Sequence, residues 1–302
     1  MPSARKITRR VLLTGAAGTA VTGTALAGSL SGVLPGRSAL RRRLGIGQVE
    51  AGVPDAGGDD PHYATFASTA RGRPVTWGWA VPPGHDPDGL PVVLVLHGRG
   101  DDAHSSFEHL GMHQYLAAHV SDGGTAMGVV SVDGDETYWH PRADGDDPIA
   151  MIAGELLPRV ADLGFSTRKI AVTGYSMGGF GSLLLAREAA HGRFGAAGQL
   201  VAAAASSPAL FASAGATSAG SFDDAEDFAT YGALAGQPGT KGLPLSVSCG
   251  VDDPFCAQTK RYRAHCDPAP DGGISDGAHT MDYWRSRVPG QLAFLGEHLA
   301  ST

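Results

Sequence analysis

One short segment constrains the fold of this chain more than any other: a serine flanked by glycines directly after a buried strand. The apolar run 169–173 leads into the sequence GYSMG at residues 174–178, and a helix-forming stretch covers residues 182–190. A strand–turn–helix of this kind is the context in which Gly-x-Ser-x-Gly forms a nucleophile elbow. Glycines on both sides of the serine remove the Cβ atoms that would clash in so sharp a turn. The pattern predicts that Ser176 is an exposed nucleophile and that the N–H of Met177, at a helix N-terminus, faces a developing oxyanion.

A second segment supplies the other oxyanion donor. The continuous apolar run 91–96 is typical of a strand buried on both faces of a parallel sheet, and it ends in the sequence HGRG at residues 97–100. A loop in this position carries a main-chain oxyanion donor in hydrolases with a nucleophile elbow. We therefore expect the backbone N–H of Arg99 to act with that of Met177. The side chains of His97 and Arg99 are expected to be structural or solvated, because the hypothesis needs only their main chain.

The acid follows another predicted strand, residues 244–250. Two adjacent aspartates, Asp252 and Asp253, come just after it. A carboxylate past a strand end can enter a cleft and hold an imidazole in the required tautomer. We favour Asp253 and keep Asp252 as the alternative; the other aspartate is expected to be solvated or to cap a helix that begins near Pro254.

The base is predicted to be His279, which lies in a loop before a helical pattern that runs to the C-terminus. His279 comes 26 positions after Asp253, which leaves room for one helix and a short strand. The nucleophile, acid and base then occur in the order Ser–Asp–His along the chain. His298 is a poor rival because a histidine near the end of a helix is usually solvated.

These segments resemble one branch of the α/β-hydrolases, which contains esterase D, S-formylglutathione hydrolase and the antigen 85 mycolyltransferases. The resemblance covers most of the chain from about residue 75 and is carried by residues 96–100, 174–179, 249–255 and 277–285. It implies the roles already assigned: nucleophile, acid and base for Ser176, Asp253 and His279, and oxyanion donors for Arg99 and Met177. The antigen 85 pattern has an acidic residue where His97 stands, which weakens a mycolyl-transfer interpretation.

The order of elements agrees with that resemblance. Predicted strands alternate with helices, which favours an α/β-hydrolase fold with a mostly parallel central sheet and helices on both faces. The stretch between Pro208 and Lys241 is too short for a large lid domain. The predicted strands are 75–81, 92–96, 126–134, 170–174, 199–207 and 244–250, and the predicted helices are 148–163, 182–190 and 289–300.

The first 34 residues differ from the rest of the chain. A basic start with the pair Arg9-Arg10 precedes a weakly apolar Ala/Gly/Thr/Leu stretch, and Ala25-Leu26-Ala27 offers a cleavage site. This pattern predicts a twin-arginine signal (residues 1–34) and a secreted protein, with an uncleaved membrane tether as the alternative. Residues 35–65 are rich in Gly, Asp and Pro and predict a flexible leader. Residues 66–302 are expected to form the catalytic domain.

Charge limits the partners. The formal net charge is −7, and removal of residues 1–27, which carry four positive charges and no acid, lowers it to −11. Such an acidic chain is unsuited to nucleic acid or to an anionic membrane surface. Contact with a membrane is expected only through an uncleaved N-terminal segment.

Several further residues are expectations of lower rank. Tyr138 and Trp139 follow a strand end and, with Tyr175 beside the nucleophile, are expected to line the substrate site. No metal or other cofactor is expected, since the four histidines between 104 and 119 lack the spacing of a zinc hydrolase. Three cysteines leave at least one free; Cys256 and Cys266 are placed on one helix about 15 Å apart, too far to bond.

Taken together, the residues predict a secreted serine hydrolase, most simply a carboxylesterase. Its substrate is expected to be a small-molecule ester or a polysaccharide or lipid ester. Two alternatives remain open at this stage. In an acyltransferase, a sugar or lipid hydroxyl replaces water. A dry, apolar acceptor groove would favour this alternative. A non-catalytic binding protein on the same fold would not need all three of Ser176, Asp253 and His279.

Overall fold

The computed structural model describes residues 41, 46–57, 60–193 and 199–301 of the 302-residue chain. The chain separates into two compact units, residues 1–48 and 49–302, and the second contains every strand of the described part. The predicted export signal, residues 1–34, and residues 35–40 and 42–45 of the predicted leader lie outside the described residues. Within the described ranges, no helix combines the length and apolar character needed to cross a membrane.

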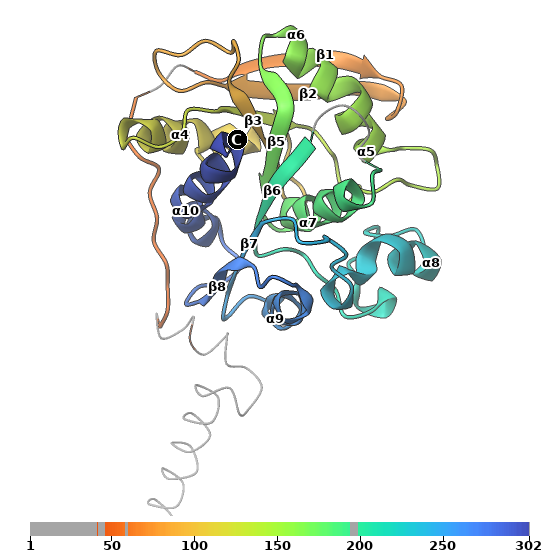
Figure 1. Ribbon diagram of the computed structural model, residues 1–302. Helices are drawn as coiled ribbons and strands as arrows, with labels where there is room; N and C mark the ends of the chain where they lie inside the picture. The colour runs from red at the N-terminus through yellow and green to blue at the C-terminus, as the bar shows by residue number, and fades with distance from the viewer. Residues whose placement is uncertain (1–40, 42–45, 58–59, 194–198, 302) are drawn as a thin grey trace, which may run out of the picture. The chain divides into compact units, whose positions relative to one another are not determined.

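A single eight-stranded sheet forms the centre of the second unit (Figure 1). Its spatial order is β1-β2-β4-β3-β5-β6-β7-β8, and every pair from β4 to β8 is parallel, whereas β1 and β2 run antiparallel to their neighbours. The central strands are almost continuously apolar because both of their faces are covered. The strands are β1 (His62–Ser68), β2 (Arg73–Ala80), β3 (Pro91–Leu96), β4 (Gly128–Val132), β5 (Ser166–Gly174), β6 (Gln199–Ser206), β7 (Leu245–Gly250) and β8 (Asp271–Ser275).

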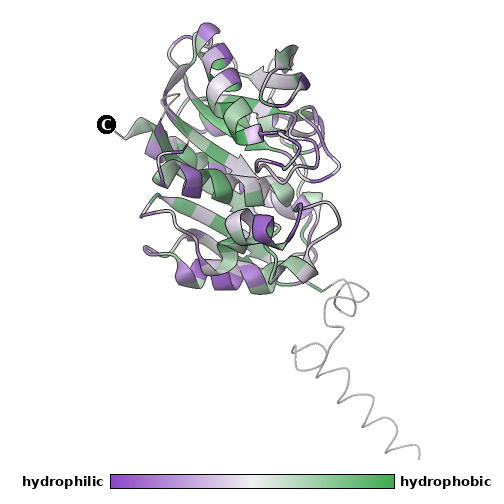
Figure 2. Cartoon of the chain, turned by 90° about the vertical axis from the view of Figure 1, so that its right-hand side faces the viewer, coloured by the Kyte–Doolittle hydropathy of each residue, from purple (hydrophilic) through white to green (hydrophobic). Residues whose placement is uncertain are grey.

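Helices cover both faces of the sheet and create two hydrophobic cores. One core joins α4 and α10 to the sheet; the other joins α5, α6, α7 and α9 to the opposite face (Figure 1). The strands are mostly apolar and the polar residues gather on outward helix faces (Figure 2). The helices are α3 (Ser105–Glu108), α4 (Met112–Ser121), α5 (Pro148–Met151), α6 (Leu157–Asp162), α7 (Met177–Ala190), α8 (Ala225–Asp227), α9 (Cys256–His265) and α10 (Met281–Ala300). A π-helical turn, Ile152–Leu156, joins α5 to α6, so the predicted helix 148–163 is one continuous segment.

The predicted fold class is confirmed, and several boundaries differ from expectation. Strand β1 begins at His62, inside the expected leader, because it pairs antiparallel with β2. Helix α7 begins directly after Ser176 rather than at Ser182, since its glycines pack against neighbouring backbone. Helix α10 begins at Met281, where the side chain of Thr280 caps it, and so includes Pro289 in its interior.

The cysteine expectation also needs a correction. Cys256 begins α9, but the helix ends at His265 and Cys266 lies just beyond it in an extended conformation. The two residues therefore do not share one helix. No disulfide joins Cys249, Cys256 and Cys266, all of which lie in the described part of the chain.

Candidate active site

Four loops meet at the carboxyl ends of the parallel strands, where ligands bind in open α/β sheets. They follow β3, β5, β7 and β8. The sequence placed the oxyanion loop, the elbow, the acid and the histidine on these same four connections.

The elbow depends on close backbone contacts around Ser176. This residue has φ 55° and ψ −118°, a conformation that a side chain other than glycine adopts only under constraint. The constraint comes from the sheet, because the N–H of Ser176 donates to Ser206 O at 3.0 Å. A Cβ at Gly178 would lie 1.9 Å from Leu96 O, and one at Gly174 would lie 2.4 Å from Gly178 O. Only glycine fits at either position, so the local sequence determines the turn.

Three side chains converge as the sequence predicted. His279 Nε2 lies 2.9 Å from Ser176 Oγ, and His279 Nδ1 lies 2.8 Å from Asp253 Oδ2. Asp253 has a fully buried side chain, and its second oxygen accepts the N–H of Phe255 at 2.8 Å. An acceptor at Nδ1 places the ring proton there and leaves Nε2 as the base toward the serine hydroxyl.

The choice between the two aspartates follows from how their loop is held. The N–H of Asp252 donates to Gly277 O at 2.9 Å, which ties the acid loop to the loop that carries His279. A Cβ at Gly250 would lie 2.4 Å from the same carbonyl oxygen, so the two loops are packed closely. In this arrangement the carboxylate of Asp253 is the one that meets the imidazole.

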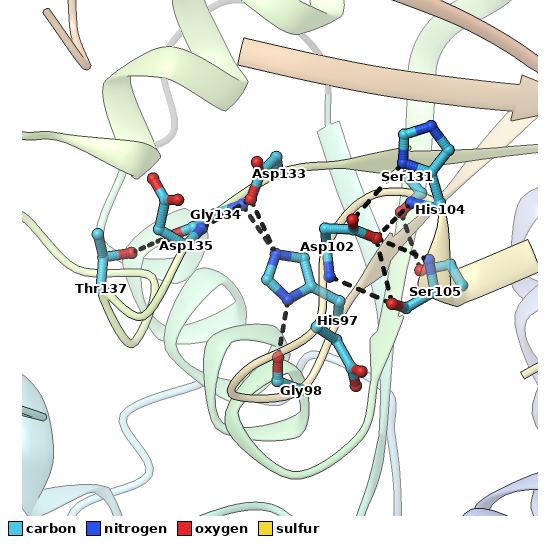
Figure 3. A network of polar contacts seen from close by, with 12 residues as sticks. His97, Gly98, Asp102, His104, Ser105, Ser131, Asp133, Gly134, Asp135 and Thr137 are labelled. Atoms are coloured by element: carbon cyan, nitrogen blue, oxygen red, sulfur yellow. Dashed lines mark hydrogen bonds and ion pairs between the residues drawn. The ribbon is translucent and has the colours of Figure 1, made fainter. Parts of the chain in front are cut away.

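The oxyanion loop is organised by the side chain of His97, which was expected to be structural or solvated and is structural. This histidine is completely buried; its Nδ1 lies 2.8 Å from Gly98 O, and its Nε2 accepts the N–H of Gly134 at 2.9 Å (Figure 3). A proton on Nδ1 satisfies both contacts. Because the carbonyl of Gly98 is held by His97, the N–H of Arg99 in the same peptide group points the opposite way.

The sequence contained a signal for the structural role of His97, but that signal lay at Gly134, far along the chain from His97. Gly134 follows the neighbouring strand β4, so an apolar strand ending in Asp-Gly beside one ending in His-Gly was the pattern to recognise. The turn is completed by the N–H of Asp101, which donates to Gly98 O at 3.2 Å. The N–H of Met177 is the first of α7, where helix geometry provides no intrahelical acceptor.

The side chain of Arg99 is not simply solvated. Its guanidinium donates to Glu136 at 2.7 Å and to Ala219 O at 2.9 Å. The hydrogen bond to Glu136 raises the pKa of Arg99 above its already high ordinary value. Arg99 thus joins the oxyanion loop to two other segments.

The three expected substrate-lining residues lie in the interior instead. Trp139 is 0% exposed and its indole lies over Gly134 and Gly181, where a Cβ at Gly181 would be 2.4 Å from the ring. Tyr138 packs against three phenylalanine rings. Both residues have positive φ (55° and 59°), and this reversal turns their rings under the loop.

Tyr175 is also buried, at 1% exposure. Its hydroxyl donates to Asp101 Oδ2 at 2.8 Å, and its ring stacks on Trp284 at 4.6 Å. Burial, reinforced by the Asp101 carboxylate, raises the pKa of Tyr175, so the hydroxyl remains a neutral donor. The aromatic side chains beside the base are others: Phe255 and Trp284 contact the His279 ring at centroid distances of 5.3 and 4.9 Å.

Comparison with known proteins found a matching family. The family model "Putative esterase" matches residues 68–295. A comparison with curated protein sequences found no match.

Solved structures with a similar fold were found at low sequence identity. A ferulic acid esterase is 16% identical, with a TM-score of 0.67 over 79% of this chain and 98% of its own. The fluorophosphonate-binding serine hydrolase F of Staphylococcus aureus is 16% identical, with a TM-score of 0.62 over 79% and 99%. An S-formylglutathione hydrolase from Agrobacterium tumefaciens is 14% identical, with a TM-score of 0.63 over 84% and 100%. At these identities the similarity establishes the α/β-hydrolase fold.

Proposed function

The chain belongs to the esterase family, and we propose that it is an exported serine carboxylesterase that works through an acyl-enzyme on Ser176. The observation that carries the proposal is the continuous contact from Asp253 through His279 to the hydroxyl of Ser176. Such an arrangement activates a hydroxyl that is otherwise a weak nucleophile.

Each step of the reaction has a residue suited to it. Ser176 Oγ attacks the ester carbonyl while His279 Nε2 accepts its proton, and buried Asp253 stabilises the imidazolium. The N–H groups of Arg99 and Met177 stabilise the tetrahedral oxyanion. His279 then gives the proton to the leaving alcohol. In the second half of the reaction His279 accepts a proton from water as the water attacks the acyl group, and then returns that proton to Ser176 Oγ.

The surroundings of the base support an ester with an apolar or aromatic acyl group. Phe211 packs edge-on against Phe255, which in turn contacts His279. A panel of p-nitrophenyl esters from acetate to palmitate, extended with feruloyl esters and acetylated sugars, tests this. We expect turnover that Ser176→Ala abolishes and exposed Ser213→Ala retains. Absence of turnover on every ester would contradict the proposal.

Acyl transfer is distinguished in the same assay. Adding a sugar or a long-chain alcohol as acceptor diverts the acyl group if the site favours transfer, and product analysis then shows a new ester. We expect free acid to remain the main product, since the acyl-enzyme is open to water on the exposed side of His279.

Export is proposed from the sequence of the N-terminal segment. Its support is the Arg9-Arg10 pair before a weakly apolar stretch with a small-residue cleavage site. Replacing both arginines by lysine should leave precursor inside the cell. Undiminished export of that variant would point to another route.

A further inference from the structure

Trp284 occupies a position that links the base to the rest of the catalytic machinery. It lies in the first turn of α10, five residues after His279, and its N–H donates to Thr280 O at 3.1 Å. The neighbouring Arg285 side chain donates to His109 O and anchors the same turn to the end of α3. The indole is therefore mounted on a rigid element directly beside a catalytic loop.

The His279 ring is held by packing as well as by its hydrogen bonds. The hydrogen bonds hold its two nitrogens toward Asp253 and Ser176, but the contact with Ser176 changes when the proton moves to Nε2, and χ2 of histidine is a broad torsion that adds little restraint of its own. The side chain is also 26% exposed. Packing adds to the restraint on the ring plane, and the rings of Trp284 and Phe255 contact it. The Trp284 ring meets it at an interplanar angle of 87°, an edge-to-face geometry that aromatic pairs favour.

The indole is itself backed from behind. Tyr175 stacks on Trp284 with 26° between the ring planes, and it is one residue before the nucleophile. The Tyr175 hydroxyl is tied to Asp101, whose N–H closes the turn at Gly98. The Tyr175 ring also fills the space beside Gly98, where a Cβ would lie 2.8 Å from it. One stack thus joins the oxyanion loop, the elbow and the histidine loop.

We propose that Trp284 is a positioning residue for the reaction, whose indole, backed by Tyr175, holds the His279 imidazole in the plane in which Nε2 faces Ser176 Oγ. This inference rests on the proposed esterase function. Misplacing a reacting group by about 1 Å can cost about a hundredfold in rate. Loss of the indole therefore lowers kcat by roughly tenfold to a hundredfold and leaves KM nearly unchanged.

The test compares Trp284→Leu with Trp284→Phe and with Trp79→Leu. Trp79 is a matched control, because it is a partly buried tryptophan that stacks on Trp77 at 4.7 Å but lies on β2. We expect the leucine variant at 284 to lose kcat by the same factor on an acetyl and a feruloyl ester, and the phenylalanine variant to recover most of it. Trp79→Leu should keep kcat within about twofold, whatever it costs in Tm. Should Trp284→Leu fail to fold, Trp284→Met is measured by the same criteria.

A proton NMR measurement provides a readout that does not depend on turnover. The low-field signal of the His279 Nδ1–H, hydrogen bonded to Asp253, should shift or broaden in Trp284→Leu and stay in place in Trp79→Leu. An unchanged signal together with kcat within twofold of wild type overturns the proposal. So does a loss confined to KM, or one that differs between the two esters, since either indicates a substrate contact. Failure of the wild type to turn over any ester counts against the proposed function, while the NMR signal still tests the role of Trp284.

Discussion

Asp253 and Asp252 are adjacent aspartates whose side chains point in different directions, and this difference makes Asp253 the candidate acid. Asp253 Oδ2 reaches His279, while the backbone of Asp252 binds the histidine loop through Gly277. Sequence favoured Asp253 but could not separate two adjacent aspartates, because which one faces the cleft depends on a contact between loops 26 residues apart. The same limit hid the part played by His97, whose partner Gly134 is distant in the chain.

Asp253→Asn should lower kcat by several orders of magnitude with little change in KM. The amide can no longer hold the His279 tautomer, and the corresponding change in a serine protease costs about 10⁴-fold. Asp252→Asn should cost about tenfold or less, which is about 1.4 kcal/mol in barrier. Steady-state kinetics on both variants, with circular dichroism to check folding, measure this. A deeper loss at 252 than at 253 would reverse the assignment.

His97→Ala should lower kcat by roughly tenfold to a hundredfold while KM stays within about twofold. Without the imidazole the Gly98–Arg99 peptide loses its orientation, and removal of a whole oxyanion donor costs about 10²–10³-fold. His298→Ala, on the last turn of α10, is the control and should behave as wild type. Equal kcat values for the two variants would show that His97 does not set the oxyanion loop.

Residues 219–221, which carry no regular structure, are held by hydrogen bonds from three distant side chains. The carbonyls of residues 219–221 accept hydrogen bonds from Arg99, His140 and Arg142, and Arg142 also pairs with Asp223. The ring of His140 lies between Phe222 and Tyr231. Sequence periodicity predicted the strands and helices well, because alternation of apolar runs and helical spacing is local. It gave no account of this segment, whose order comes from partners 78 to 120 residues away.

Arg142→Met should loosen residues 219–223 and leave the sheet intact. Most of the Arg142 hydrogen bonds are exposed, so their loss should cost about 1 kcal/mol and Tm should fall by roughly 2–4 °C. Limited proteolysis should cut near residue 220 faster than in wild type. Arg193→Met, at a more exposed ion pair with Glu188, is the control. Identical cleavage rates in the two variants would contradict this account.

Across the whole molecule, acidic and tyrosine groups set the pH range of stability in opposite directions. Burial alone would raise the pKa of Glu155, but hydrogen bonds from Ser68 and from the N–H groups of Thr69 and Ala70 outweigh it and hold that pKa below 4.5. Asp223 behaves likewise through Ala143 and Arg142, below 3.8. Burial raises the pKa of Tyr63 and of Tyr283 from 10.0 to about 12.

Burial also lowers the pKa of His113 and His119 from 6.5 and raises that of Cys266 from 9.0 to about 11, so the free energy of unfolding should be highest between about pH 6.5 and pH 9. A carboxylate whose pKa is lowered by folding stabilises the fold above its unfolded pKa, and this stabilisation is lost as the pH falls below about 4.5. A tyrosine whose pKa is raised stabilises the fold below pH 10, and this is lost as the pH rises toward 12. Urea titrations from pH 3 to pH 11.5 measure both limbs. Glu155→Gln should flatten the acid limb, and an unchanged limb would exclude this carboxylate as a cause.

The central claim is that Ser176 forms the covalent intermediate. A fluorophosphonate reacts with an activated serine, so the wild-type protein should gain one adduct, and peptide mass mapping should place it on the peptide that contains Ser176. Ser176→Ala should stay unlabelled under the same conditions, and Ser213→Ala should label as wild type. A label on another residue, or equal labelling of Ser176→Ala, would contradict the account.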